Sequence, residues 1–174
     1  TDSADALTIV IEDLGTHDPE IMLDGATAEE AHAIMTALGG LHAKYWQRKN
    51  LDGHDWIPNS AVMAPALVGM ANQVIPGFLE RFGDGMPVEL RSALDKARGA
   101  YGELIEFAAK NPNQSLCHMD THLGNILFQN GKPRFLDWQA FMIQSFSYDI
   151  AYFLNGNLMP TIRRKNQEGF LDTY

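Results

Sequence analysis

Side chains that can take part in chemistry are concentrated in residues 117–125, Cys-His-Met-Asp-Thr-His-Leu-Gly-Asn. A further carboxylate, Asp137, follows an Asn-Gly pair at residues 130–131, which is the strongest short-range signal for a β-hairpin. Such a hairpin would fold Asp137 back beside Asn125, with Asp120 across the preceding loop. We therefore expect two carboxylates and one amide oxygen to converge on a small volume.

Oxygen atoms in this arrangement suit Mg²⁺, which proteins hold through one or two carboxylates together with substrate phosphates. A carboxylate that lies near the metal without being consumed by it can orient and deprotonate a hydroxyl group. Two alternatives stay open at this point. One is a metal-dependent hydrolase whose zinc ligands would be His118, Asp120, His122 and Asp137. The other is a polar loop that caps a strand and has no chemical role.

The composition excludes several classes of protein. The chain has 174 residues, of which 45% are hydrophobic, and a formal net charge of −9, as expected of one globular domain. Its single cysteine, Cys117, rules out a disulfide scaffold and is expected to be a buried, inert thiol. Without a cluster of Lys and Arg we expect no nucleic-acid partner. Residues 1–6 have no basic signal region and the apolar run 61–71 is short, so we expect a cytoplasmic protein without a membrane partner.

The chemical segment lies within a mainly helical pattern. Apolar spacing, capping signals and turn residues predict a strand at 7–11, helices at 27–46, 60–82 and 87–110, strands at 115–118, 125–129 and 134–138, and helices at 148–154 and from Pro160 onward. His42 and Trp46 are assigned to the core of the first long helix. The sequence thus predicts an α+β fold, mostly helical, with a small hairpin that carries the metal site.

The pattern His118-x-Asp120-x-x-x-x-Asn125, followed by Asp137, resembles the catalytic loop and metal-binding aspartate of the aminoglycoside phosphotransferase and choline kinase group. That group shares the protein-kinase-like fold. Three other stretches resemble it in the same order: residues 9–14 its hinge, residues 41–46 the first helix of its large lobe, and residues 149–151 its later acidic motif. The Trp-Gln pair at 138–139 resembles the ecdysteroid-kinase-like branch of the group.

The resemblance implies an ATP-dependent small-molecule kinase, which transfers the γ-phosphoryl group of Mg-ATP to an alcohol group of its acceptor. It implies that Asp120 is the catalytic base and that Asn125 and Asp137 hold Mg²⁺. His118 would support the loop and Asp149 would brace it from behind. Neither the identity of the acceptor nor the oligomeric state can be derived from these motifs.

The resemblance also divides the chain. Residues 1–14 resemble the last strand of a small lobe and the hinge, and residues 15–174 resemble a helical C-terminal lobe. The hinge residues Glu12, Asp13 and Leu14 would bind the adenine of the cofactor through their backbone.

Two features depart from the family pattern. A glycine-rich loop and a strand lysine should precede the hinge, yet no G-x-G-x-x-G occurs and the first lysine is Lys44. We therefore expect the small lobe to lie upstream, the last helix to be cut short, and the chain to be inactive by itself. Met119 stands where the family usually has glycine. A pseudokinase, which keeps the fold and binds nucleotide or a partner without the reaction, is the alternative function.

Overall fold

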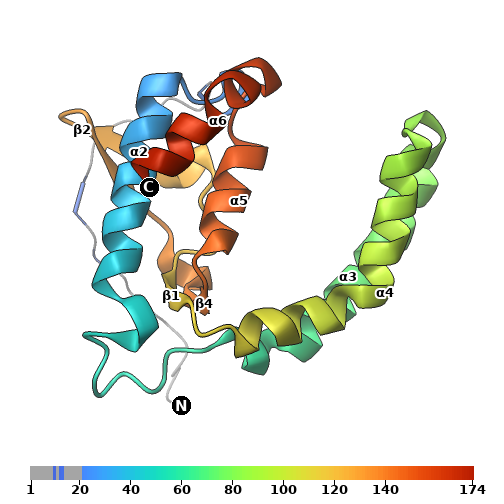
Figure 1. Ribbon diagram of the computed structural model, residues 1–174, viewed down its shortest axis with the longest axis horizontal. Coiled ribbons are helices and arrows are strands. Elements are labelled where there is room, and N and C mark those ends of the chain that lie inside the picture. The colour runs from blue at the N-terminus through green and yellow to red at the C-terminus, as the bar shows by residue number, and fades with distance from the viewer. Residues whose placement is uncertain (1–9, 11, 14–20) are drawn as a thin grey trace, which may run out of the picture.

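The computed structural model describes Val10, Glu12, Asp13 and residues 21–174 (Figure 1). Its helices and strands are α1 (Ile21–Asp24), α2 (Ala28–Lys44), α3 (Ser60–Phe82), α4 (Val88–Lys110), β1 (Gln114–Cys117), β2 (Ile126–Gln129), β3 (Lys132–Phe135), β4 (Met142–Ser145), α5 (Ser147–Gly156) and α6 (Pro160–Thr173). The strand predicted at 7–11 falls, except for Val10, outside the described residues. Helices with two small sheets match the predicted α+β class.

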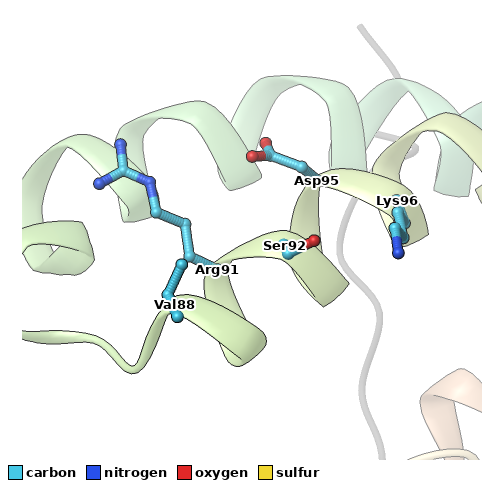
Figure 2. Close-up of a pocket in the computed structure, with 5 residues that line it drawn as sticks. All are labelled: Val88, Arg91, Ser92, Asp95 and Lys96. Carbon is cyan, nitrogen blue, oxygen red and sulfur yellow. The ribbon is translucent and has the colours of Figure 1, made fainter.

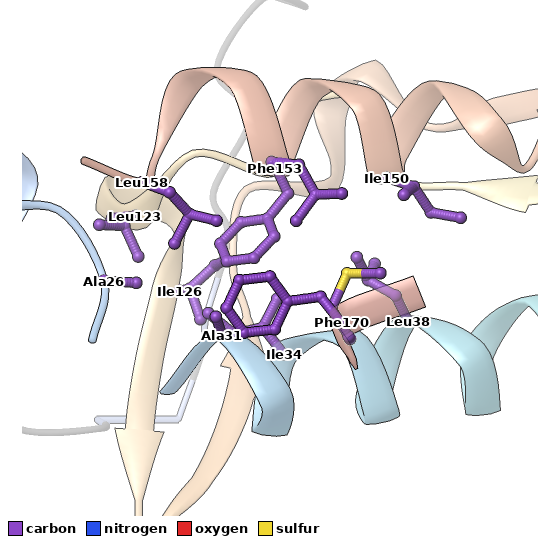
Figure 3. Packing of buried hydrophobic residues seen from close by; sticks show 12 residues of the cluster. Ala26, Ala31, Ile34, Leu38, Leu123, Ile126, Ile150, Phe153, Leu158 and Phe170 are labelled. Carbon is purple, nitrogen blue, oxygen red and sulfur yellow. The ribbon is translucent and has the colours of Figure 1, made fainter. Parts of the chain in front are cut away.

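The first long helix begins where its capping signal predicts. The Thr27 side chain accepts a hydrogen bond from the Glu30 backbone, and the Glu30 carboxylate accepts one from the Thr27 backbone at 2.9 Å, which completes a capping box. The buried face of α2 then packs against α5 and α6. Figure 3 shows Phe153 of α5 and Phe170 of α6 meeting over this face, where both rings are fully buried. This core fixes α5, the helix that contacts the chemical loop.

The two adjacent glycines of α2 have different surroundings. A Cβ atom on Gly39 would lie 2.7 Å from the carbonyl oxygen of Tyr174, at the end of α6, whereas one on Gly40 would meet nothing within 4 Å. Glycine at position 39 therefore permits the close approach of the chain after α6, and position 40 only weakens the helix.

We expect Gly39→Ala and Gly40→Ala to change stability in opposite directions. Gly39→Ala should lower the free energy of unfolding by about 1–3 kcal/mol, because the new methyl group overpacks the contact with Tyr174. Gly40→Ala should raise it by about 0.5–1 kcal/mol, because alanine favours an exposed helical position. Urea denaturation of the full-length protein measures both. Equal changes in the two variants would contradict this packing.

Two antiparallel pairs of strands carry the loop region. β2 and β3 form the hairpin predicted from the Asn-Gly pair, with Ile126 opposite Phe135 and both turn residues at positive φ. The second strand was predicted to run to residue 138 but ends at Phe135, because Asp137 has a left-handed backbone with φ of 56°. β4, which pairs with β1, was not predicted, since its sequence Met-Ile-Gln-Ser lacks the alternation typical of a half-buried strand.

Helices α3 and α4 form a long hairpin that projects from the rest of the molecule (Figure 1). Both match their predicted ranges, and many of their large apolar side chains are exposed. By length and composition alone, the segment Ser60–Gly85 could cross a membrane. The longest uninterrupted apolar run, 61–71, is too short to indicate this, because Asn72 and Gln73 interrupt the apolar pattern before it resumes. The absence of a membrane partner stays a prediction.

Candidate functional site

The loop that follows β1 is held from behind by the carboxylate of Asp149, which is completely buried. Asp149 Oδ2 accepts the backbone N–H of His118 at 2.7 Å, and Oδ1 accepts that of Met119 at 2.8 Å. The Thr121 hydroxyl donates to the backbone carbonyl of Asp149 at 3.1 Å. The two bonds to the carboxylate fix the backbone before Asp120, because charged hydrogen bonds in a dry interior are strong, and the Thr121 hydroxyl anchors the residue after it.

A second buried side chain supports this carboxylate. His42 Nε2 donates to Asp149 Oδ2 at 3.2 Å, and His42 Nδ1 shares a hydrogen bond of 2.8 Å with the Tyr174 hydroxyl. Burial, with smaller effects of Cys117 and Asp149, raises the pKa of Tyr174 above its usual range, so the phenol keeps its proton. His42 is buried as predicted, but it belongs to a polar network and not to an apolar core.

His42, Cys117 and Asp149 are also close enough to one another to suggest a metal site, and they are the only such group in the described part of the chain. Hydrogen bonds already explain why these three side chains lie close together. The Cys117 thiol lies 3.5 Å from the carbonyl oxygen of Gln144, and burial, followed by the charge of Asp149, raises its pKa well above the ordinary value. A protonated thiol is a poor metal ligand, so this group is a structural network.

Asp120 lies at the surface of the loop, with 30% of its side chain exposed. Its Oδ2 accepts the Asn125 amide N–H at 3.1 Å, and its Oδ1 accepts the Tyr152 hydroxyl at 3.0 Å. His122 Nε2 lies 3.6 Å from Oδ2. The predicted base and one predicted metal ligand are therefore in contact, and the side chain of the base is partly exposed.

The hairpin brings Asp137 to the same place. The Leu136 N–H donates to the Asn125 carbonyl at 2.8 Å, and the ring of His118 donates through Nε2 to the Leu136 carbonyl at 2.7 Å. Asp137 follows directly and is exposed, and its Oδ2 accepts from Gln139 at 3.2 Å. The backbone contact of Leu136 thus brings the chain at Asp137 back to Asn125, and the Asp137 carboxylate is exposed there.

The side-chain oxygen atoms of Asn125 and Asp137 are of the kinds that bind Mg²⁺. The amide N–H group of Asn125 faces Asp120, because it donates to both the backbone carbonyl and the carboxylate of that residue. Its carbonyl oxygen therefore points to the other side of the amide group, while Asp137 supplies an exposed carboxylate. A hard cation that takes one carboxylate, one amide oxygen and substrate phosphates matches this set.

The hydrogen bonds of His118 argue against the alternative of a zinc site. Its Nδ1 accepts the Asp120 backbone N–H at 3.3 Å and its Nε2 donates to the Leu136 carbonyl. Both ring nitrogens therefore already have hydrogen-bond partners within the protein. Among the described residues, His118, Asp120, His122 and Asp137 do not form a group with converging ligand atoms. His118 therefore has the geometry of a supporting residue.

A hollow of about 380 Å³ lies beside this site. It is lined by Glu12 and by residues 133–136, the segment that leads directly to Asp137. Of the predicted hinge residues, Glu12 thus borders a space of the size of a ligand pocket. Asp13 is described and exposed, and Leu14 lies outside the described residues.

Met119 has a backbone conformation that favours glycine, the residue usual at this position in the kinase group that the sequence resembles. Its φ of 73° is left-handed, which costs an L-residue roughly 1–2 kcal/mol. The Met119 side chain is nevertheless buried, and it packs with Cys117 and Met142. Apolar packing thus compensates the backbone cost, and the loop keeps its shape without glycine.

Two further hollows involve the projecting hairpin. One, of about 270 Å³, is mostly apolar and extends from Leu67 and Leu104 to Met119 and Tyr148. The other is lined by Val88, Arg91, Ser92, Asp95 and Lys96. Figure 2 shows that these five side chains all come from one stretch of α4, so the second hollow is a shallow surface feature.

Sequence reasoning missed three residues of this region. His42 stands one turn after Leu38 on the buried face of α2, and a histidine in such a position needs a buried polar partner. Tyr152 and Tyr174 contact the site from α5 and from the end of α6, across long sequence separations. No local pattern signals the two tyrosine contacts.

Comparison with known proteins identifies a family. The model of the ecdysteroid kinase-like family matches residues 1–174, which includes the predicted hinge, the loop and the hairpin. No curated protein and no solved structure matches the chain.

Proposed function

The chain belongs to the ecdysteroid kinase-like family of kinase-like phosphotransferases, and from this premise we propose that it carries the catalytic loop of an ATP-dependent small-molecule kinase. The proposal rests chiefly on the contact of Asp120 with Asn125, beside the exposed carboxylate of Asp137. The acceptor is a small molecule with a hydroxyl group, and the cofactors are ATP and Mg²⁺.

In this proposal Asp120 acts as the general base. The acceptor hydroxyl donates its proton to the Asp120 carboxylate while its oxygen forms a bond to the γ-phosphorus. The bond from the γ-phosphorus to the β–γ bridging oxygen breaks, and ADP leaves. Positioning and charge neutralisation supply most of the rate in such reactions. The loop contacts of Asp149 serve positioning, since they fix the backbone of the two residues before the base and anchor the Thr121 side chain after it.

Asn125 and Asp137 would hold the metal through an amide oxygen and a carboxylate. When bound, Mg²⁺ neutralises charge on the phosphates. The hollow between Glu12 and residues 133–136 would take the adenine, because it adjoins the segment leading to Asp137. In this proposal the nucleotide would lie on the hairpin side of Asp120 and the acceptor on its exposed side.

We expect Asp137→Asn to remove most of the Mg²⁺-dependent ATP binding of the full-length protein. Loss of a partner that only orients a metal ligand costs about 10–100-fold in metal affinity, so loss of a direct ligand should cost at least 10-fold. Titration calorimetry with ATP, with and without Mg²⁺, measures the effect. The matched control is Asp95→Asn, an exposed aspartate of α4, which should bind as the wild type does. Unchanged binding by Asp137→Asn would contradict the metal assignment.

A further inference from the structure

We propose that Tyr152 is a positioning residue for Asp120, an inference that rests on the proposed function. The Tyr152 hydroxyl donates to Asp120 Oδ1 at 3.0 Å, while the Asn125 amide donates to Oδ2 at 3.1 Å. The two oxygens of one carboxylate thus each have their own donor. The terminal torsion of an aspartate side chain is soft and roughly two-fold, so a donor on each oxygen selects one orientation of the base.

Helix α5 reaches this loop from two sides. Asp149 binds the loop backbone from the buried interior, and Tyr152, almost one helical turn later, reaches the exposed side chain of Asp120. Residues three apart on a helix share a face. The same rigid element therefore holds both the backbone of the loop and the carboxylate that it presents, which couples the position of the base to the core beneath α5.

The Tyr152 ring is itself supported. It stacks on Tyr148, with ring centroids 6.1 Å apart and an angle of 24° between the planes. Burial, then the hydrogen bond to Asp120 and the negative charge of that residue, raise the pKa of Tyr152 above its ordinary value. The phenol therefore keeps its proton at neutral pH and remains a donor. Since a carboxylate oxygen accepts more than one hydrogen bond, an acceptor hydroxyl can reach Oδ1 while Tyr152 stays in place.

The test is Tyr152→Phe in the full-length protein, which removes the hydroxyl and keeps the stacked ring. Activity is measured as transfer of the labelled γ-phosphate of Mg-ATP to a panel of hydroxyl compounds that comprises amino sugars, choline, a polyhydroxylated steroid and water. We expect kcat to fall about 10- to 100-fold, with the KM for ATP within about two-fold of wild type, because a misplaced group slows the chemical step without weakening nucleotide binding.

Tyr148→Phe is the matched control, since it removes the hydroxyl of the stacked neighbour, which makes no hydrogen bond with Asp120 in the described structure. It should keep wild-type kcat. A second comparison adds Tyr152→Phe to Asp120→Asn. If Tyr152 acts through Asp120, the double variant should be no slower than Asp120→Asn alone.

Wild-type kcat in Tyr152→Phe, or a further 10-fold loss in the double variant, would overturn the inference and leave the proposed function standing. Different results would contradict the proposed function itself. Asp120→Asn would then turn over at the wild-type rate, or the wild-type protein would transfer label to no compound of the panel, water included, and the inference would fall with the function on which it rests.

Discussion

Asp120→Asn in the full-length protein should lower kcat by about 10²- to 10⁴-fold, the range for loss of a positioned general base. The amide has nearly the size of the carboxylate, so the loop held by Asp149 should keep its shape. It cannot take up the proton of the acceptor, however. Affinity for Mg-ATP should stay within about three-fold, because the proposed metal ligands are Asn125 and Asp137 and not Asp120.

A coupled assay of ADP release measures kcat, and calorimetry measures ATP binding on the same preparation. Asp95→Asn on the exposed surface of α4 is the control for the same chemical change away from the loop. A variant that lost ATP binding together with turnover would place Asp120 in the metal site. Turnover at the wild-type rate would exclude it as the base.

Asp149→Ala should have the largest effect on stability, a loss of about 3–5 kcal/mol, as found when one member of a buried charged network is removed. The variant leaves the backbone N–H groups of His118 and Met119 without their acceptor, and it leaves His42 Nε2 without an acceptor. Each buried group without a partner costs about 1–3 kcal/mol.

Urea denaturation of the full-length protein gives the change in the free energy of unfolding. Asp95→Ala provides a control on the surface and should stay within about 0.5 kcal/mol of wild type. A loss of less than 1 kcal/mol in Asp149→Ala would show that the loop does not depend on this carboxylate.

Local sequence signals predicted the elements that depend on neighbouring residues. The capping box of Thr27 and Glu30 fixes the start of α2, and the Asn-Gly pair at 130–131 fixes the hairpin, because both act over a few residues. β4 lacked such a signal: its pairing partner β1 lies far away in sequence, and all four of its residues are buried, including Gln144 and Ser145.

The same distinction applies to the site. The spacing of Asp120, Asn125 and Asp137 around a loop and a hairpin is local. In the structure Asp120 contacts Asn125, and the backbone of Leu136, directly before Asp137, contacts Asn125 as well. The contact of Tyr152 with Asp120 spans 32 positions and arises from the packing of α5 against the core. Contacts of this kind follow from tertiary structure, so sequence patterns could not predict them.

The most direct measurement of the central claim is the transfer of phosphate itself. The full-length protein is incubated with Mg²⁺ and ATP labelled in the γ-phosphate, together with the panel of hydroxyl compounds, and mass spectrometry identifies the labelled product. We expect label on the hydroxyl oxygen of an acceptor, dependent on Mg²⁺ and lost in Asp120→Asn. Binding of Mg-ATP without transfer to any compound would contradict this expectation and would favour a pseudokinase.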